Sequence, residues 1–271
     1  MDFTKFVDLM ETSELYLHRV DLLDDKREGR FTEHEYTRLS QRPDDLATST
    51  EESRRWSFVN CWREGADESR AMWDLYGANC CGVAIKTQMK SLRSAIGGSD
   101  IHIHIGRVKY VDWREYDAAA GNLIGMCVRK SEGYMHEKEV RLLWSSLLEP
   151  DREPGAQVDV GVPFDAERVA EGIMEQLAAL FPSADFTGVK GKLLVMKAWL
   201  RYTQKLQLEL LGCGKRVRVD LTDLIDEVVV GPLAEEWLLD LTRKMLRRYN
   251  LSQLSEKVRF SELRAEPRRH E

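Results

Sequence analysis

Short strand-like segments are scattered between helical segments in no regular order, and this constrains the fold more than any other feature of the sequence. Apolar residues alternate over 15–20 and 101–105, whereas over 3–10 and 232–249 they recur at helical spacing. A regular strand–helix alternation would indicate a doubly wound parallel sheet. The irregular order instead favours an α+β fold, with a mixed, mostly antiparallel split sheet flanked by helices.

The 271 residues lie at the upper limit of a single domain, and apolar residues are spread along the whole length. Prolines and glycines gather between Asp151 and Pro163, which predicts a loop. Long helical periodicity then runs on to Leu211, before Gly212 and Gly214. We therefore predict one α+β domain over residues 1–271, with a helical insert at residues 151–212.

Several predicted strands and helices contain or flank the candidate site residues. Apolar runs predict strands at Trp56–Trp62 and Val140–Leu148. Helices are expected over Ala66–Tyr76, with Asp67 as the capping residue, and over Gly121–His136. Pro232 is expected to open an amphipathic helix that runs to Tyr249, because proline suits the first helical turn. His102 and His104 are expected to share one face of a strand over 101–105.

Charge and cysteine content exclude some classes of protein. Forty basic and 46 acidic residues give a net charge of −6, so the sequence does not indicate bulk electrostatic binding of nucleic acid. Five cysteines, two of them adjacent and none in a Cys-x-x-Cys motif, suggest neither a disulfide framework nor a structural zinc site. No apolar run reaches the roughly 20 residues of a membrane span. We therefore expect a soluble protein of the reducing cytoplasm.

Several runs, read together, resemble a known family. They are Leu15-Tyr16 through Asp21, Asp24 and Glu28-Gly29; Phe58-Val59-Asn60-Cys61-Trp62; Glu68 to Gly77; Gly82-Val83-Ala84-Ile85; Lys130 with Glu137 to Arg141; and Leu224 to Pro232 followed by Trp237. With these runs the chain resembles the bacterial family catalogued as domain of unknown function 2971. The resemblance covers most of the chain and implies no activity, because the family name carries none.

The run Glu137-Lys138-Glu139-Val140-Arg141 is the strongest candidate for chemistry. Two carboxylates two residues apart at the start of a strand point to the same side, and like charges that close shift each other's pKa. The run resembles the Glu-x-Glu element of mono-ADP-ribosyltransferases. That resemblance implies that Glu139 stabilises the positive ribosyl centre as nicotinamide leaves NAD, and that Glu137 orients the acceptor.

The same resemblance implies a set of NAD-binding residues. Arg19 lies on an early strand, where this class places an arginine or histidine against the dinucleotide. Ser69, Trp73 and Tyr76 match the positions of a serine or tyrosine and of an aromatic ring that stacks on nicotinamide, and Arg141 would contact phosphate or ribose. The sequence departs from the class at Phe58–Cys61, which lacks the Ser-Thr-Ser strand. The leading hypothesis is an NAD-dependent ADP-ribosyltransferase-like enzyme, a bacterial toxin or phage-defence effector, with a macromolecular acceptor of unknown type.

Two other hypotheses remain open. Asp24 and Glu28 could join Glu137 and Glu139 to hold a hard cation, as in a metal-dependent nuclease. The third hypothesis is a non-catalytic binding or regulatory module, in which Glu139 and Arg141 form an ordinary ion pair. In that case the aromatic residues on the helix before Gly77 serve packing alone, the commonest role of aromatics at helical spacing.

Overall fold

The computed structural model describes residues 1–39, 50–51, 53–99, 101–116, 123–146 and 212–264. These residues belong to one compact unit, formed by Met1–Glu149 together with Gly214–Glu271, except for the two positions that precede Gly214. Apart from its last position, the helical insert predicted for residues 151–212 lies outside the described residues. No helix in the described ranges is both long enough and apolar enough to cross a membrane.

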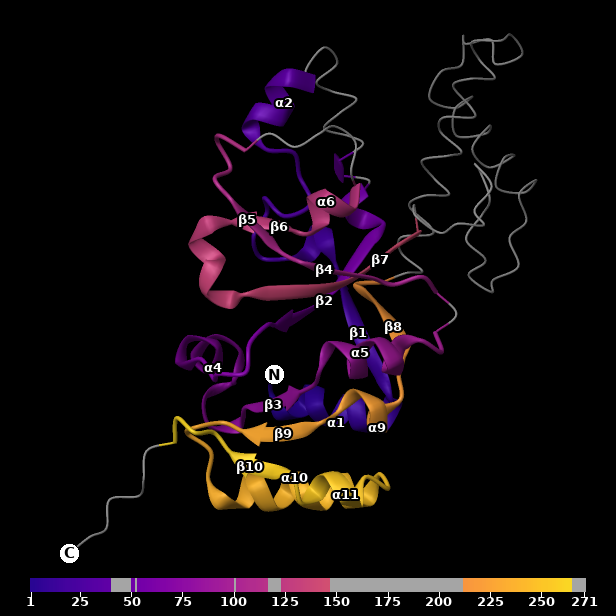
Figure 1. The fold of residues 1–271 in the computed structure, drawn as a ribbon, viewed down its shortest axis with the longest axis vertical. Coiled ribbons are helices and arrows are strands. Elements are labelled where there is room, and N and C mark those ends of the chain that lie inside the picture. Colours follow the sequence, from indigo (N-terminus) through magenta and orange to yellow (C-terminus); the bar gives the residue numbers. More distant parts are fainter. Residues whose placement is uncertain (40–49, 52, 100, 117–122, 147–211, 265–271) are drawn as a thin grey trace, which may run out of the picture. The chain divides into compact units, whose positions relative to one another are not determined.

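A five-stranded sheet forms the centre of this unit (Figure 1). Its strand order is β4-β7-β2-β1-β8, and every neighbouring pair is antiparallel. The strands are β1 (Glu14–Arg19), β2 (Ser57–Arg63), β4 (His104–Arg107), β7 (Glu139–Ser145) and β8 (Gly214–Arg218). Every residue of β7 is buried. Strand β1 pairs with β8, whose residues lie some 200 positions later in the sequence.

Two smaller sheets complete the split arrangement. One has the order β10-β9-β3, with β9 antiparallel to β3 and parallel to β10, and the other pairs β5 with β6 in parallel. The strands are β3 (Val83–Lys86), β5 (Lys109–Val111), β6 (Arg129–Ser131), β9 (Glu227–Val230) and β10 (Val258–Phe260). The mixed, mostly antiparallel α+β fold predicted from the sequence is confirmed.

Eight helices and three 3-10 turns are named in the described residues. The named ones are α1 (Phe3–Thr12), α2 (Glu33–Leu39), α4 (Arg70–Tyr76), α5 (Met89–Ile96), α6 (Leu123–Cys127), α9 (Leu221–Leu224), α10 (Glu236–Arg248) and α11 (Ser252–Ser255), with 3-10 turns η1 (Val20–Leu22), η2 (Asn79–Cys81) and η3 (Glu132–Glu137). Helix α1 is capped at both ends: the Asp2 carboxylate accepts the N–H of Lys5 at 2.9 Å, and Ser13 ends the helix in a left-handed conformation.

Alternate residues of the central strands bury a continuous apolar layer. Phe58, Leu17 and Leu142 are fully buried, and the rings of Phe58 and Trp144 lie 5.3 Å apart. Each such side chain contributes roughly 1.5–3 kcal/mol by leaving water. This burial fixes the register of β2 against β7, because a slip of one residue would turn the apolar side chains to the opposite face.

The helix predicted over Gly121–His136 is wrong beyond Cys127. Residues after α6 form the short strand β6 and then the 3-10 turn η3. The reason is tertiary: β6 pairs with the distant β5, and two of its side chains, Arg129 and Lys130, enter buried ion pairs. Buried ion pairs with partners far along the chain override a local helical pattern.

Four smaller expectations also change. Helix α4 begins at Arg70 with Ser69 as its N-cap, so the capping role predicted for Asp67 is wrong. Helix α10 begins at Glu236, four residues after Pro232, because the chain first makes a turn. Strand β4 begins at His104, so His102 lies outside it, although the two imidazole rings are 4.5 Å apart.

Candidate active site

The Glu137–Arg141 run lies where η3 ends and the central strand β7 begins. Glu137 is the last residue of η3, Lys138 adopts a left-handed conformation with φ 44°, and Glu139 opens β7. Both glutamates reach one ammonium group, since Lys130 Nζ lies 2.5 Å from Glu137 Oε2 and 3.5 Å from Glu139 Oε2. The turn at Lys138 thus brings the paired carboxylates to a single point.

A third carboxylate and a guanidinium complete this centre. Arg141 donates from Nε to Glu139 Oε1 at 2.8 Å, from Nη2 to Glu28, and from Nη1 to the carbonyl of Cys127 at 2.7 Å. Lys130 Nζ also lies 3.7 Å from Glu28 Oε1. We refer to five residues as the ion cluster: Glu28, Lys130, Glu137, Glu139 and Arg141. Each of them is at most 7% exposed, so water screens their charges little.

The cluster combines three carboxylates with two cations, and the surroundings shift their pKa values in different directions. Burial alone would raise the pKa of Glu139, but the hydrogen bond and charge of Arg141 lower it. Burial raises the pKa of Glu28, and the charges of Arg141 and Lys130 offset only part of this. Burial opposes the charge of Lys130, yet the hydrogen bond that it donates to Glu137 and the charges of the carboxylates raise its pKa. The lowered pKa keeps Glu139 ionised. The raised pKa means that Glu28 takes up a proton at a higher pH than an ordinary glutamate does.

Three tyrosines surround the cluster. The Tyr76 hydroxyl donates to Glu137 Oε1 at 3.0 Å, and the Tyr110 hydroxyl accepts the backbone N–H of Glu139 at 2.8 Å. The ring of Tyr134 lies 4.5 Å from Lys130 Nζ. Tyr76 is 49% exposed and Tyr134 is 37% exposed. Tyr76 and Tyr134 therefore contact both the ion cluster and solvent.

The strand register shows which side chains share a face with Glu139. His18 lies opposite Val59, and Val59 lies opposite Leu143. Directly opposed residues, and alternate residues of a strand, project from the same face of a sheet. His18 and the exposed Cys61 therefore lie on the face that carries Glu139. The protein around the Cys61 sulfur raises the pKa of its thiol, and the Glu139 carboxylate adds to the effect.

Of the residues predicted from the sequence, the structure brings Glu137, Glu139, Arg141 and Tyr76 together. It places the other three elsewhere. Arg19 lies opposite Phe58, on the other face of the sheet, and its Nε donates to Asp21 at 2.7 Å.

Ser69 caps α4 without a side-chain hydrogen bond. The indole N–H of Trp73 donates to Glu68, which is not part of the ion cluster, at 3.0 Å. Trp73 and Tyr76, both expected to line one nicotinamide pocket, therefore hydrogen-bond to different carboxylates.

The sequence reasoning missed Lys130, Tyr110 and His18 as site residues. Lys130 was named only as part of the family resemblance, because a lysine in a charged run is usually a surface residue. The alternation over residues 15–20 places His18 and Arg19 on opposite faces of the strand, and this is the signal that could have identified His18.

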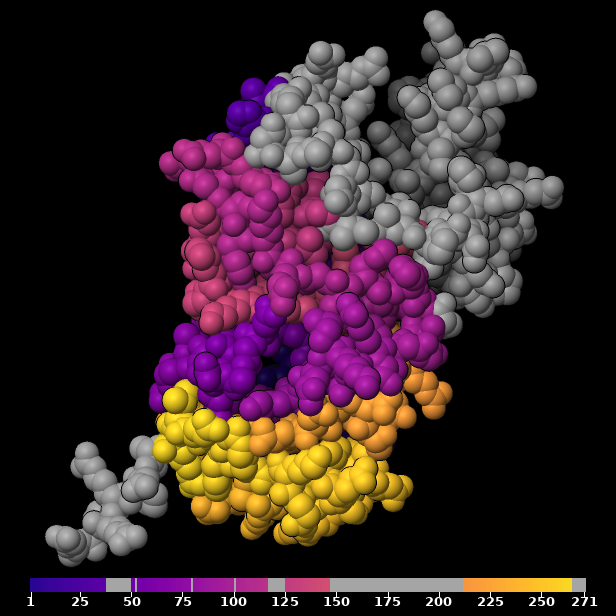
Figure 2. Space-filling model, viewed as in Figure 1, coloured from indigo at the N-terminus to yellow at the C-terminus, as the bar shows by residue number. Residues whose placement is uncertain are grey.

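The surface is hollowed close to these residues. Figure 2 shows a deep hollow between the segment that contains α4 and the segment that contains α5. Tyr76 is the last residue of α4, and its hydroxyl group reaches Glu137. The hollow therefore borders α4, whose last residue is half exposed and contacts the ion cluster.

The carboxylates proposed for metal binding are arranged differently from a metal site. Glu28 does lie with Glu137 and Glu139, but Lys130 Nζ occupies the space among the three. Asp24 is exposed and lies outside the cluster. Within the described part of the chain, no three or more His, Cys, Asp or Glu side chains are grouped to hold a metal ion.

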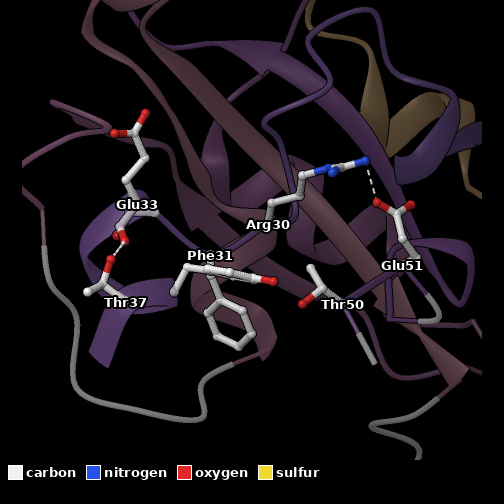
Figure 3. Close-up of a pocket in the computed structure, with 8 residues that line it drawn as sticks. Arg30, Phe31, Glu33, Thr37, Thr50 and Glu51 are labelled. Carbon is white, nitrogen blue, oxygen red and sulfur yellow. Dashed lines mark hydrogen bonds and ion pairs between the residues drawn. The ribbon is translucent and has the colours of Figure 1, made fainter. Parts of the chain in front are cut away.

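A separate pocket of about 560 Å³ lies beside α2 (Figure 3). Its wall is formed by Arg30, Phe31, Thr32, Glu33, Tyr36, Thr37, Thr50 and Glu51. Arg30 forms an ion pair with Glu51 across it, as Figure 3 shows. The pocket shares no residue with the ion cluster, and its charged wall residues include this neutralising pair. It therefore adds nothing to the chemistry of the candidate site.

Comparisons with known proteins add no assignment: no family model, no curated protein and no solved structure matches this chain.

Proposed function

We propose that this protein is an ADP-ribosyltransferase-like enzyme that transfers the ADP-ribosyl group of NAD to a macromolecular acceptor. The observation that carries the proposal is the setting of Glu139. It opens the central strand, it is held by Arg141, and its partner Glu137 contacts Tyr76 at the end of α4. A role as toxin or phage-defence effector, and membership of the domain of unknown function 2971 family, belong to the same proposal.

In this proposal each residue of the cluster has a distinct task. The ionised Glu139 carboxylate stabilises the positive ribosyl centre that forms as the bond to nicotinamide breaks. Arg141 positions this carboxylate, and Glu137 orients the acceptor. His18 takes the place that the sequence resemblance gave to Arg19, because it shares the face of Glu139. Tyr76, half exposed beside Glu137, contributes an aromatic wall for the flat nicotinamide ring.

The experiment is incubation of the purified chain with NAD, alone and with cell lysate, followed by measurement of released nicotinamide and of labelled macromolecules. We expect Glu139→Gln to lower the rate by roughly 100-fold or more, since it removes an electrostatic contact to the transition state. Glu256→Gln serves as the matched control at an 80%-exposed carboxylate. His18→Ala should raise KM for NAD more than Arg19→Ala does.

The burial of the cluster favours one competing function, a non-catalytic module in which the ion pairs are structural. That reading predicts that wild type releases no nicotinamide and labels nothing, while Glu139→Gln lowers the free energy of unfolding. Such a result would overturn the enzymatic proposal. Activity that requires Mg²⁺ or Mn²⁺ and disappears with a chelator would instead support the nuclease hypothesis.

A further inference from the structure

Two neighbouring thiols lie on the surface turn between α4 and β3. Cys80 and Cys81 occupy η2, both are free thiols, and their Sγ atoms are 3.6 Å apart. Cys80 is exposed and Cys81 is half-buried. They are also the only adjacent cysteines in the sequence, and neither belongs to the ion cluster.

The turn that carries these thiols is tightly constrained. Ala78 has a left-handed conformation with φ 46°, and the Cys81 N–H donates to its carbonyl at 3.2 Å. Gly82 packs directly on Gly77, where an added Cβ would lie 2.3 Å from the Gly77 carbonyl oxygen. The Gly82 carbonyl in turn accepts the N–H of Gly231 at 2.9 Å. The backbone therefore holds the two sulfur atoms side by side.

The spacing suits a bridging atom better than a direct disulfide. Adjacent residues have Cα atoms about 3.8 Å apart, below the usual range of about 4.4–6.8 Å for a disulfide, so a direct bond is strained. An atom bonded to each sulfur at about 2.3 Å, a typical metal–thiolate length, would make an angle of about 103° between sulfur atoms 3.6 Å apart. A pyramidal or tetrahedral centre accepts such an angle.

The number of ligands selects the kind of atom. Zinc favours four protein ligands in a structural site, and the described residues provide no group of three or more metal-binding side chains. An organic trivalent arsenical needs only two sulfur atoms, because carbon is its third substituent. We propose that Cys80 and Cys81 form a chelating dithiol site for a trivalent arsenical of the type R–As=O.

The reaction balances without an oxidant. Each thiol gives up its proton, two As–S bonds replace the As=O bond, and the oxygen leaves as water with both protons, so arsenic stays trivalent. The thiol–thiol contact, followed by burial, raises the pKa of Cys81. This inference is independent of NAD chemistry, because it concerns binding at a different set of residues.

The test uses the purified full chain, reduced with a phosphine, and phenylarsine oxide as the probe. We expect intact-mass analysis to show one adduct formed with loss of one water, the disappearance of two titratable thiols, and release by 2,3-dimercaptopropanol. Cys80→Ser and Cys81→Ser should each weaken retention on an immobilised arsenical by roughly 100-fold or more, because a chelating pair exceeds a single thiol by about that factor.

Cys61→Ser and Cys213→Ser are the matched controls, because both remove a single exposed thiol. They should leave retention unchanged, and circular dichroism should show that all four variants are folded. Retention that survives in folded Cys80→Ser, or a wild-type chain that forms no adduct at equal concentrations, would overturn the site. So would an adduct that consumes only one thiol.

Discussion

Glu28 is the carboxylate of the ion cluster whose pKa is raised. Lys130 is shared among three carboxylates, and Arg141 between two. With all groups ionised the cluster would contain three negative and two positive charges. Burial is the main cause that raises the pKa of Glu28, and the neighbouring Glu139 carboxylate adds to it.

A pH dependence follows from Glu28. A carboxyl whose folded-state pKa is raised above its ordinary 4.5 contributes stability below that value and loses it as the pH rises through the folded pKa. In Glu28→Gln this loss is absent, so the variant should gain stability relative to wild type as the pH rises above 4.5. Urea unfolding at about pH 4 and about pH 8 measures the difference. Glu256→Gln, at a well-exposed carboxylate, controls for the charge change, and a pH-independent difference would contradict the prediction.

At the scale of elements, the turn from α4 into β3 depends on close backbone contact. Gly82→Ala would place a methyl group against the Gly77 carbonyl, and overpacking of this kind costs about 1–3 kcal/mol. Gly98→Ala is the matched control, since nothing lies within 4 Å of an added Cβ there, and it should change stability by less than about 0.5 kcal/mol. Thermal or urea unfolding of the two variants checks this. Equal effects would show that the close packing at Gly82 does not matter.

Elements with clear periodicity and caps could be predicted from the sequence, as α1 and the central strand β7 show. Glu139 and Arg141 could be paired because they lie two apart on one strand. Lys130 could not be assigned, because its burial depends on Glu28, which lies 102 positions earlier in the sequence. The failure over Gly121–His136 has the same origin, since the pairing of β6 with β5 is invisible to a local pattern.

At the scale of the whole molecule, one carboxylate joins the C-terminal strand to the segment before α4. Glu68 accepts the Trp73 indole N–H at 3.0 Å, the Arg259 guanidinium at 3.0 Å, the Glu262 backbone N–H at 3.1 Å and the Ser261 hydroxyl. Burial alone would raise the pKa of Glu68, but these donors lower it. Glu68 thus stabilises contacts between residues nearly 200 positions apart.

Glu68→Ala should lower the free energy of unfolding by about 2–3 kcal/mol, because hydrogen bonds to a charged group are lost. It should also speed amide exchange and proteolytic cleavage in β10, which hydrogen exchange and limited proteolysis measure. Glu262→Ala is the control, since this 75%-exposed carboxylate contacts Arg259 at 3.4 Å, and we expect a change below about 1 kcal/mol. If both variants speed amide exchange and cleavage in β10 equally, Glu68 is not the residue that stabilises this strand.

The pairing of β1 with β8 has a consequence for how the protein is made. Residues Glu14–Arg19 find their outer neighbour only when Gly214–Arg218 have been synthesised. At ribosomal rates of about 5–20 residues per second, that interval lasts on the order of 10–40 s. During this time the nascent chain presents an open strand edge, the kind of surface that other chains can pair with. We therefore expect the newly synthesised chain to depend on chaperones that shield strand edges until the C-terminal part leaves the ribosome.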